Sequence, residues 1–229
     1  MKTSVVAIIP VKDLTRTKSR LREVLSPSER RAFTLGMLSR TVQVLTSSNS
    51  VEGILISTPD DRVLSYAKEL GVPGLKEEGR GLNRALQQAT RWSMDLHFGA
   101  VLVIPCDLPL LRVEDIRALV GPACSKDKVV VIAPNEDRSG TNGLLVKPPG
   151  MIRYAFGTNS FSHHQSWAFE QKLNVVVYSS PSIAFDLDRP EQCRSPFARR
   201  YFLNKVVDDE NRLRTFDPYS GCSPYPAAR

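Results

Sequence analysis

Short apolar runs rich in β-branched residues alternate along the chain with segments of helical periodicity. Seven such runs are predicted to be strands, over residues 4–11, 53–58, 100–106, 129–134, 143–146, 174–179 and 183–188. Their apolar character is nearly continuous, which is typical of strands buried on both faces of a largely parallel sheet. Because predicted helices separate these strands, the pattern indicates an α/β fold with crossover connections.

The clearest helix is predicted to begin after Ser26. Ser26 suits the N-cap, Pro27 suits the first helical position, and Glu29 completes a capping box. Apolar residues from Ala32 to Leu45 then recur at helical spacing and predict one buried stripe. Further helices are predicted over residues 60–70, 82–95, 113–119, 160–173 and 191–206.

The chain of 229 residues is expected to form one domain over residues 1–206, followed by a tail. Residues 207–229 are rich in proline, serine and charge, which is typical of a mobile or loosely docked segment. The apolar fraction of 41% and the charged fraction of 24% exclude the disordered and fibrous classes.

The net charge of +7 suggests nucleic acid, an anionic membrane or a polyphosphate ligand as partner. Nucleic acid is not expected, because the chain lacks interleaved aromatic platforms and a helix-turn-helix or RNA-binding motif. A membrane is not expected either, since no apolar run approaches the ~18 residues of a span. Four cysteines without a C-x-x-C pair, and no signal peptide, indicate reduced thiols and a cytoplasmic protein.

The segment after the first predicted strand has an unusual concentration of positive charge. Four cations follow Pro10 and Val11 within nine residues: Lys12, Arg16, Lys18 and Arg20. Loops at the carboxyl ends of strands bind ligands in open α/β sheets. The chain has no glycine-rich phosphate loop, so lysine and arginine side chains would have to hold phosphates here. A solvated basic loop explains the spacing equally well.

Three aspartates are predicted to lie at strand ends. Asp107 follows the predicted strand over residues 100–106, and Asp186 and Asp188 close the one over residues 183–188. The period of two places Asp186 and Asp188 on the same side of that strand. Each aspartate could simply cap a turn. Two such sites in one chain favour a magnesium site, because Mg²⁺ prefers carboxylate oxygens.

Two further segments could carry chemistry, and the second of them could hold an anion. Thr141 and Asn142 precede a short predicted strand, and Gly157 and Ser160 enter a predicted helix. The free N–H groups at such a helix start can receive a phosphate. An ordinary N-capped helix is the simpler explanation for Gly157 and Ser160.

Other polar residues also have simple structural explanations. Gly81, Leu82 and Asn83 could approach a base or ribose, but they equally suit a helix start. The histidines are poorly placed for a catalytic triad or a metal cluster, and at least one of His163 and His164 is expected at the surface.

Seven motifs follow one another over about residues 5–190: IPVKDLTRTKSRL, STPDD, GLNRAL, VIPCDLPLL, APNEDRSGTNGLLV, FGTNSFSHH and FDLDRP. In this order they resemble the 2-phospho-L-lactate guanylyltransferase family of the deazaflavin coenzyme (coenzyme F-420) pathway. The first motif, D-L-P, G-T-N and F-G-x-x-S-F are specific in combination, whereas each alone is weak. The chain departs from the family pattern after its last acids, where DLDRPEQC has arginine and cysteine in place of threonine and leucine.

The resemblance implies a Rossmann-like, mixed and mostly parallel sheet with flanking helices, similar to glycosyltransferase A-type nucleotidyltransferases. The implied reaction joins GTP to 2-phospho-L-lactate or phosphoenolpyruvate and releases pyrophosphate. A related nucleotidyltransferase or glycosyltransferase with another phosphorylated acceptor is the nearest alternative, because fold alone does not determine function. A homodimer is expected from the frequency of such assemblies.

The resemblance also implies roles for individual residues. Nucleotide contacts are implied for Pro10, Val11, Lys12, Lys18, Arg20, Gly81, Leu82 and Asn83, with Lys12 and Lys18 acting in catalysis. Contacts with the phosphorylated acid are implied for Thr141, Asn142, Gly157 and Ser160. Mg²⁺ ligands are implied at Asp107, Asp186 and Asp188.

Overall fold

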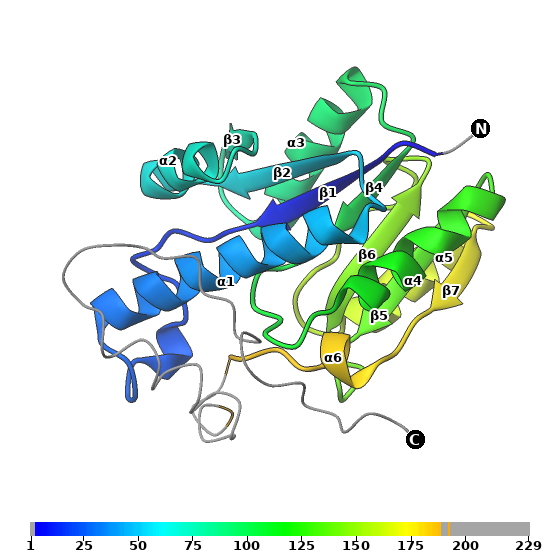
Figure 1. The fold of residues 1–229 in the computed structure, drawn as a ribbon. Coiled ribbons are helices and arrows are strands. Elements are labelled where there is room, and N and C mark those ends of the chain that lie inside the picture. Colours follow the sequence, from blue (N-terminus) through cyan, green and yellow to red (C-terminus); the bar gives the residue numbers. More distant parts are fainter. Residues whose placement is uncertain (1–2, 189–191, 193–229) are drawn as a thin grey trace, which may run out of the picture.

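One seven-stranded sheet organises the part of the chain that this computed structural model describes, residues 3–188 and 192 (Figure 1). The strands are β1 Val5–Pro10, β2 Gly53–Thr58, β3 Gly74–Lys76, β4 Ala100–Val103, β5 Val129–Pro134, β6 Thr141–Lys147 and β7 Asn174–Val177. Their order across the sheet is β3-β2-β1-β4-β6-β5-β7. Strand β6 runs antiparallel to β4 and β5, and the other paired strands are parallel. The predicted mixed, mostly parallel α/β sheet is confirmed.

Helices cover both faces of the sheet (Figure 1). They are α1 Pro27–Ser48, α2 Asp61–Glu69, α3 Leu82–Asp95, α4 Val113–Ser125, α5 Ser160–Glu170 and α6 Pro181–Ala184, with a 3₁₀ turn at Ser19–Leu21. Helices α1, α2, α4 and α6 pack on one face, and α3 and α5 pack on the other. Successive β1 residues such as Ala7 and Ile8 enter opposite cores. Burial on both faces explains the continuous apolar runs.

Helix α1 begins as predicted. The Ser26 hydroxyl accepts a hydrogen bond from the Glu29 amide, and the Glu29 carboxylate accepts one from the Ser26 amide. Leu38 and Leu45 are buried as expected, but Ala32 is exposed. The apolar stripe therefore begins one residue later than predicted, at Phe33.

Residues 183–188, predicted as a strand, do not form one. Residues Pro181–Ala184 form the short helix α6, and residues 185–188 have no regular structure. Pro181 suits the first helical position, and the Ser180 hydroxyl accepts a hydrogen bond from the Ile183 amide, so local capping outweighs strand propensity. Strand periodicity therefore does not explain how the following acids are placed.

Several boundaries also differ from prediction. Strand β3, an edge strand of three residues without a β-branched run, was missed. Strand β4 ends at Val103, and α4 continues past Gly121 and Pro122, which usually end a helix. The predicted helix over residues 191–206 and the tail over residues 207–229 lie outside the described residues. No helix in the described part of the chain has the length and apolarity required to cross a membrane.

The strand order brings the loops after β1 and β4 to the same edge of the sheet. Strand β1 pairs with β2 on one side and with β4 on the other, all three being parallel. The chain therefore leaves β1 and β4 at the same edge of the sheet, at a point where the strand order reverses. Open α/β sheets bind ligands at such positions.

Candidate active site

An ion pair joins the loop after β1 to the loop after β4. Lys18 Nζ lies 2.9 Å from Asp107 Oδ2 and 3.7 Å from Asp188 Oδ1. The Lys18 side chain is only 8% exposed, so water screens this pair weakly. Arg20 Nη1 lies 2.6 Å from Asp188 Oδ2. The structure thus brings together predicted phosphate-binding cations and predicted metal ligands from three distant segments.

The charges at this centre depend on one another. Burial raises the pKa of the Asp107 carboxyl, but the charge and hydrogen bond of Lys18 outweigh it and hold that pKa below its ordinary value. Burial lowers the Lys18 pKa, but the Asp107 charge outweighs it, and the net shift is upward. Asp186 differs, because burial and the nearby Asp107 charge both raise its pKa. Among the described residues, no lysine or arginine forms an ion pair with Asp186.

Two of these carboxylates are chemically suited to a magnesium ion that would take its remaining ligands from substrate. No three acidic, histidine or cysteine side chains within residues 3–188 and 192 lie close enough to hold a metal by themselves. Mg²⁺ is usually bound by one or two carboxylates together with substrate phosphates. Asp107 and Asp186 provide hard oxygen ligands, and their mutual repulsion is the kind that a bound cation relieves. The three-aspartate magnesium site stays a prediction.

The remaining residues of the β1 loop surround this centre. The Val11 amide donates to the Ser57 carbonyl at 2.8 Å, which extends the β1–β2 pairing one residue beyond Pro10. Lys12 is exposed, and its charge also lowers the pKa of Asp107. Both predicted catalytic lysines thus act electrostatically on the same carboxylate.

The segment carrying Asp186 and Asp188 is held in place by its backbone. The Leu187 amide donates to the Asp107 carbonyl at 3.1 Å, and the buried Leu187 side chain packs beside α1. Upstream, the Asn142 side-chain nitrogen donates to the Ile183 carbonyl at 2.9 Å and to the Ala184 carbonyl at 3.1 Å. Asn142, predicted to contact substrate, therefore also holds the backbone just before Asp186 in place.

Asp115 is an organising residue that sequence reasoning missed. Its buried carboxylate accepts hydrogen bonds from the hydroxyls of Tyr178 at 2.8 Å, Ser180 at 2.6 Å and Ser182 at 2.7 Å. It also accepts one from the Arg112 amide at 2.9 Å. These bonds tie α4 to the segment that leads into α6. The capping position of Asp115 was visible in the sequence, but its distant hydroxyl partners were not.

Arg40 is a second missed residue. Its guanidinium is buried and donates from Nε to the Pro109 carbonyl at 3.1 Å and from Nη2 to the Leu111 carbonyl at 3.0 Å. These bonds fix the D-L-P-L-L turn that carries Asp107. The sequence showed only a cation within a helix, since its partners lie about seventy residues away.

The N-terminus of α3 contacts the segment before α5. The Asn83 side chain donates to the Phe156 carbonyl at 3.1 Å and accepts from the Phe156 amide at 2.8 Å. Gly81 and Gly157, one on each side of this contact, have φ angles of +103° and +133°. Such angles strain any residue with a Cβ atom. The structure brings Gly81, Leu82, Asn83 and Gly157 together, and their contacts with substrate stay predictions.

A buried histidine completes this side of the site. His164 Nε2 accepts a hydrogen bond from the Ala155 amide at 3.0 Å, so Nδ1 carries the proton and donates to Thr141 Oγ1 at 3.0 Å. The Thr141 hydroxyl proton is left free for another acceptor. Ser160 is the first residue of α5 and is buried. No side chain caps the N-terminus of α5 with a hydrogen bond. His163 is exposed, as expected for one of the pair.

Hydrogen bonds and the short stretches of chain between them connect most of the predicted site residues. The links run from Asn83 to Phe156, through Ala155 and His164 to Thr141, and on through Asn142 and α6 to the Asp107–Lys18 pair. This order was not predictable from the sequence.

We expect His164 to make stability depend on pH. Burial, with a smaller effect of His163, lowers the pKa of His164 to about 4, against 6.5 in the unfolded chain. The unfolded state therefore binds more protons between these values, so this stability is complete above pH 6.5 and is lost as the pH falls toward 4. The loss between pH 7 and 4.5 should be about 2 kcal/mol, measured by urea unfolding.

The adjacent exposed histidine provides the control for this prediction. His164→Gln should show a smaller loss over the same pH range, whereas His163→Gln should keep most of the wild-type loss. Equal pH dependence in wild type and His164→Gln would contradict the assignment of a neutral, buried imidazole.

Comparison with solved structures shows the class of fold. A nucleotidyl transferase from Methanothermobacter superposes with a TM-score of 0.62 at 14% identity, covering 88% of this chain and 98% of that one. The 4-diphosphocytidyl-2C-methyl-D-erythritol synthase of Anaerococcus prevotii superposes with a TM-score of 0.59 at 10% identity, covering 89% of this chain and 100% of that one. The fold is thus that of nucleotidyltransferases, with cations and carboxylates at the ligand-binding edge of the sheet.

The chain belongs to the family described as "Guanylyl transferase CofC like", whose model matches residues 5–195. A phosphoenolpyruvate guanylyltransferase from Rubrobacter xylanophilus is 43% identical over 188 residues, covering 82% of this chain and 91% of that protein. A 2-phospho-L-lactate guanylyltransferase from Methanothermobacter thermautotrophicus is 40% identical over 192 residues, covering 83% of this chain and 82% of that protein. The resemblance seen in the motifs is confirmed.

Proposed function

We propose that this protein transfers the guanylyl group of GTP to the phosphate of a three-carbon acid, either phosphoenolpyruvate or 2-phospho-L-lactate. The observation that carries the proposal is the Lys18–Asp107 pair, which lies at the ligand-binding edge of a guanylyltransferase-family fold. The relatives named for these two acceptors are 43% and 40% identical to the chain, so both remain candidates. The product would serve deazaflavin coenzyme synthesis.

The reaction needs no protein base to generate its nucleophile. A phosphate monoester has a second pKa near 6 and is largely dianionic at neutral pH. One of its oxygens attacks the α-phosphorus of GTP, forming a new P–O bond, while the bond between the α-phosphorus and the bridging oxygen breaks and pyrophosphate leaves. The buried imidazole in this region, His164, is hydrogen-bonded at both nitrogens, which agrees with a structural role.

The main task of the protein is then to bring two anions together. Repulsion between unit charges ~4 Å apart is on the order of 4 kcal/mol at an effective dielectric near 20. Lys12, Lys18 and Arg20 would offset this repulsion and hold the triphosphate in line with the acceptor. Thr141, with its free hydroxyl proton, and the uncapped start of α5 at Ser160 would hold the phosphorylated acid.

Asp107 and Asp186 would hold magnesium together with substrate phosphate oxygens, while Asp188 pairs with Arg20 beside them. When bound, the ion neutralises phosphate charge and stabilises the leaving pyrophosphate. Lys18 lies 2.9 Å from Asp107, and its charge lowers the pKa of that carboxyl, so it can keep Asp107 ionised before substrate binds. We also propose that the enzyme acts on small molecules in the cytoplasm, as a homodimer.

Mass spectrometry of the products tests this function directly. The purified protein is incubated with GTP, MgCl₂ and one candidate acid at a time: phosphoenolpyruvate, 2-phospho-L-lactate or 3-phosphoglycerate. We expect a guanylylated acid of the corresponding mass, with equimolar pyrophosphate, from one of the first two acids. The absence of a guanylylated product from both of the first two acids, or a product from 3-phosphoglycerate alone, would contradict the proposal.

A further inference from the structure

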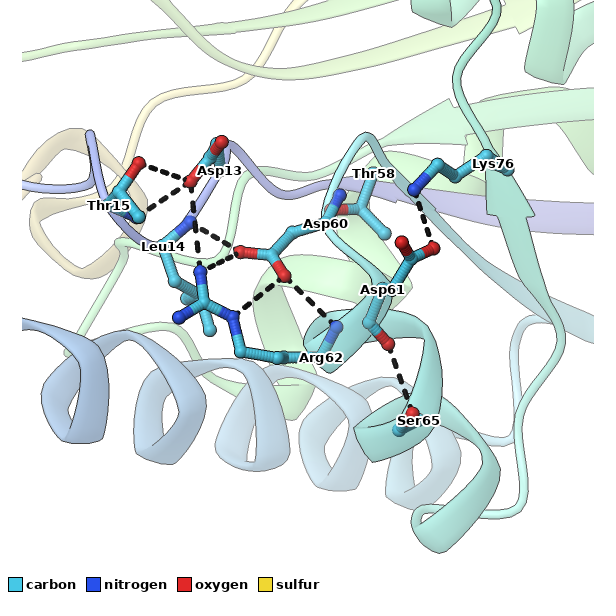
Figure 2. Close-up of polar contacts among 9 residues, drawn as sticks. All are labelled: Asp13, Leu14, Thr15, Thr58, Asp60, Asp61, Arg62, Ser65 and Lys76. Carbon is cyan, nitrogen blue, oxygen red and sulfur yellow. Dashed lines mark hydrogen bonds and ion pairs between the residues drawn. The ribbon is translucent and has the colours of Figure 1, made fainter.

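The cationic loop is fixed to the rest of the protein at several points. The Val11 amide bonds to β2, and the Thr17 hydroxyl lies 2.9 Å from the Thr34 hydroxyl of α1. Between these points, the Leu14 amide donates to Asp60 Oδ2 at 2.9 Å (Figure 2). Two anchors therefore lie between Lys12 and Lys18, and the one at Leu14 holds the loop through its backbone.

The Asp60 carboxylate is a fixed hydrogen-bond acceptor. It lies between β2 and α2, is 7% exposed, and donates its amide to the Thr58 hydroxyl at 3.2 Å. Its Oδ1 accepts from the Arg62 amide at 3.0 Å, which makes Asp60 the N-cap of α2. N-capping requires only one side-chain oxygen. The second oxygen is therefore available to the loop, 46 residues away in sequence.

Arg62 locks the Asp60 carboxylate in this orientation. Its Nε lies 3.0 Å from Asp60 Oδ1 and its Nη2 lies 2.7 Å from Asp60 Oδ2, a two-point contact that fixes the plane of the carboxylate. Nη2 also lies 3.9 Å from Asp13 Oδ1, on the loop itself (Figure 2). Mainly through the Arg62 hydrogen bond, the pKa of Asp60 is lowered to about 2, so at neutral pH the carboxylate only accepts.

We propose that Asp60, oriented by Arg62, is a positioning residue that holds the Lys12–Lys18 loop in the conformation that receives the triphosphate. The inference rests on the proposed function, since it assumes that this loop binds GTP. Asp60 does not touch substrate and acts through the Leu14 backbone. Lys18 has a left-handed φ of 48°, a conformation that most residues adopt only when their surroundings hold them there.

Asp60→Asn separates the two roles of the carboxylate. Asparagine is as good an N-cap as aspartate, so α2 should remain capped. The Leu14 and Arg62 amides bond to different oxygens of Asp60, however, and in asparagine one of these positions is an NH₂ group, which donates and cannot accept. We expect the loop anchor to be lost, with about tenfold weaker GTP binding in the presence of MgCl₂, measured by isothermal titration calorimetry.

The matched control is Asp61→Asn. Asp61 is the next residue and the first of α2, its side chain is 85% exposed, and it pairs with Lys76 rather than with the loop (Figure 2). The substitution makes the same change in charge at the same helix end. We expect less than about twofold change in GTP affinity, because exposed ion pairs contribute little.

Two further measurements distinguish positioning from a general loss of structure. In Asp60→Asn the KM for GTP should rise about tenfold, while the KM for the acid should change less than about twofold, since the acid-binding residues lie on other elements. Hydrogen exchange of the Leu14 amide should become faster in Asp60→Asn and should stay slow in Asp61→Asn.

The outcomes separate this inference from the proposed function. Wild-type protein that binds GTP, together with equally tight binding by Asp60→Asn, would overturn the positioning role alone. A parallel rise of both KM values, or unchanged exchange at Leu14, would also overturn it. Wild-type protein that binds no GTP would overturn the proposed function, and this inference with it.

Discussion

Replacing Asp107 with asparagine should reduce guanylyl transfer by about a hundredfold, equivalent to roughly 3 kcal/mol of transition-state stabilisation. The charges of Lys18 and Lys12 lower the pKa of Asp107, and the charge of Asp107 raises the pKa of Asp186. Asparagine keeps the shape of the side chain but removes the negative charge with which Asp107 would bind the magnesium ion. The measurement is Mg²⁺-dependent pyrophosphate release with GTP and the accepted acid.

Two controls show whether the effect belongs to the site. Circular dichroism should show the wild-type fold, because the Asp107 backbone carbonyl can still accept from Leu187. Asp127→Asn makes the same change on an exposed residue just before β5, at the opposite edge of the sheet, and should leave turnover within about twofold of wild type. Undiminished turnover in Asp107→Asn would remove this residue from the site.

Replacing Lys18 with glutamine should lower kcat by about a hundredfold to a thousandfold. The substitution removes the cation that lies between Asp107 and Asp188, so Asp107 loses its ion-pair partner and Asp188 keeps only Arg20. It also removes a positive charge from the proposed GTP-binding loop, while glutamine meets the same left-handed backbone conformation as lysine. The rate of pyrophosphate release, measured at saturating GTP and saturating acid, gives kcat directly.

Arg16→Gln is the matched control for Lys18→Gln. Arg16 lies in the same loop, is exposed, and loses the same charge. If position rather than total charge matters, this variant should keep kcat within about threefold of wild type, with a modest salt-dependent change in KM for GTP. Equal losses in the two variants would indicate that the loop contributes only diffuse positive charge.

The strands and long helices were largely predictable because their signals are local. The continuous apolar runs identified six of the seven observed strands, and the Ser26–Glu29 capping box placed the start of α1 correctly. The errors arose where tertiary contacts or caps outweighed local propensity. At residues 183–188, the Ser180 cap and the Asn142 hydrogen bonds produced a helical turn instead of a strand.

The residues proposed for chemistry were also identifiable, because charge and motif are properties of the sequence. Their supports were not. Arg40, Asp60, Asp115 and His164 each bond to segments far away along the chain, and no spacing rule connects such partners. A buried arginine or aspartate within a helical pattern looks the same in sequence as an exposed one.

The sequence by itself determined the α/β class, the positions of most elements and the motifs that resemble the family. Only the tertiary structure decided that Lys18 pairs with Asp107, that Asp186 approaches it without a strand, and that Asp60 anchors the loop at Leu14. The physical reason is the range of the interactions. Periodicity and capping act over a few residues, whereas ion pairs and buried hydrogen bonds form between groups that meet only when the sheet has assembled.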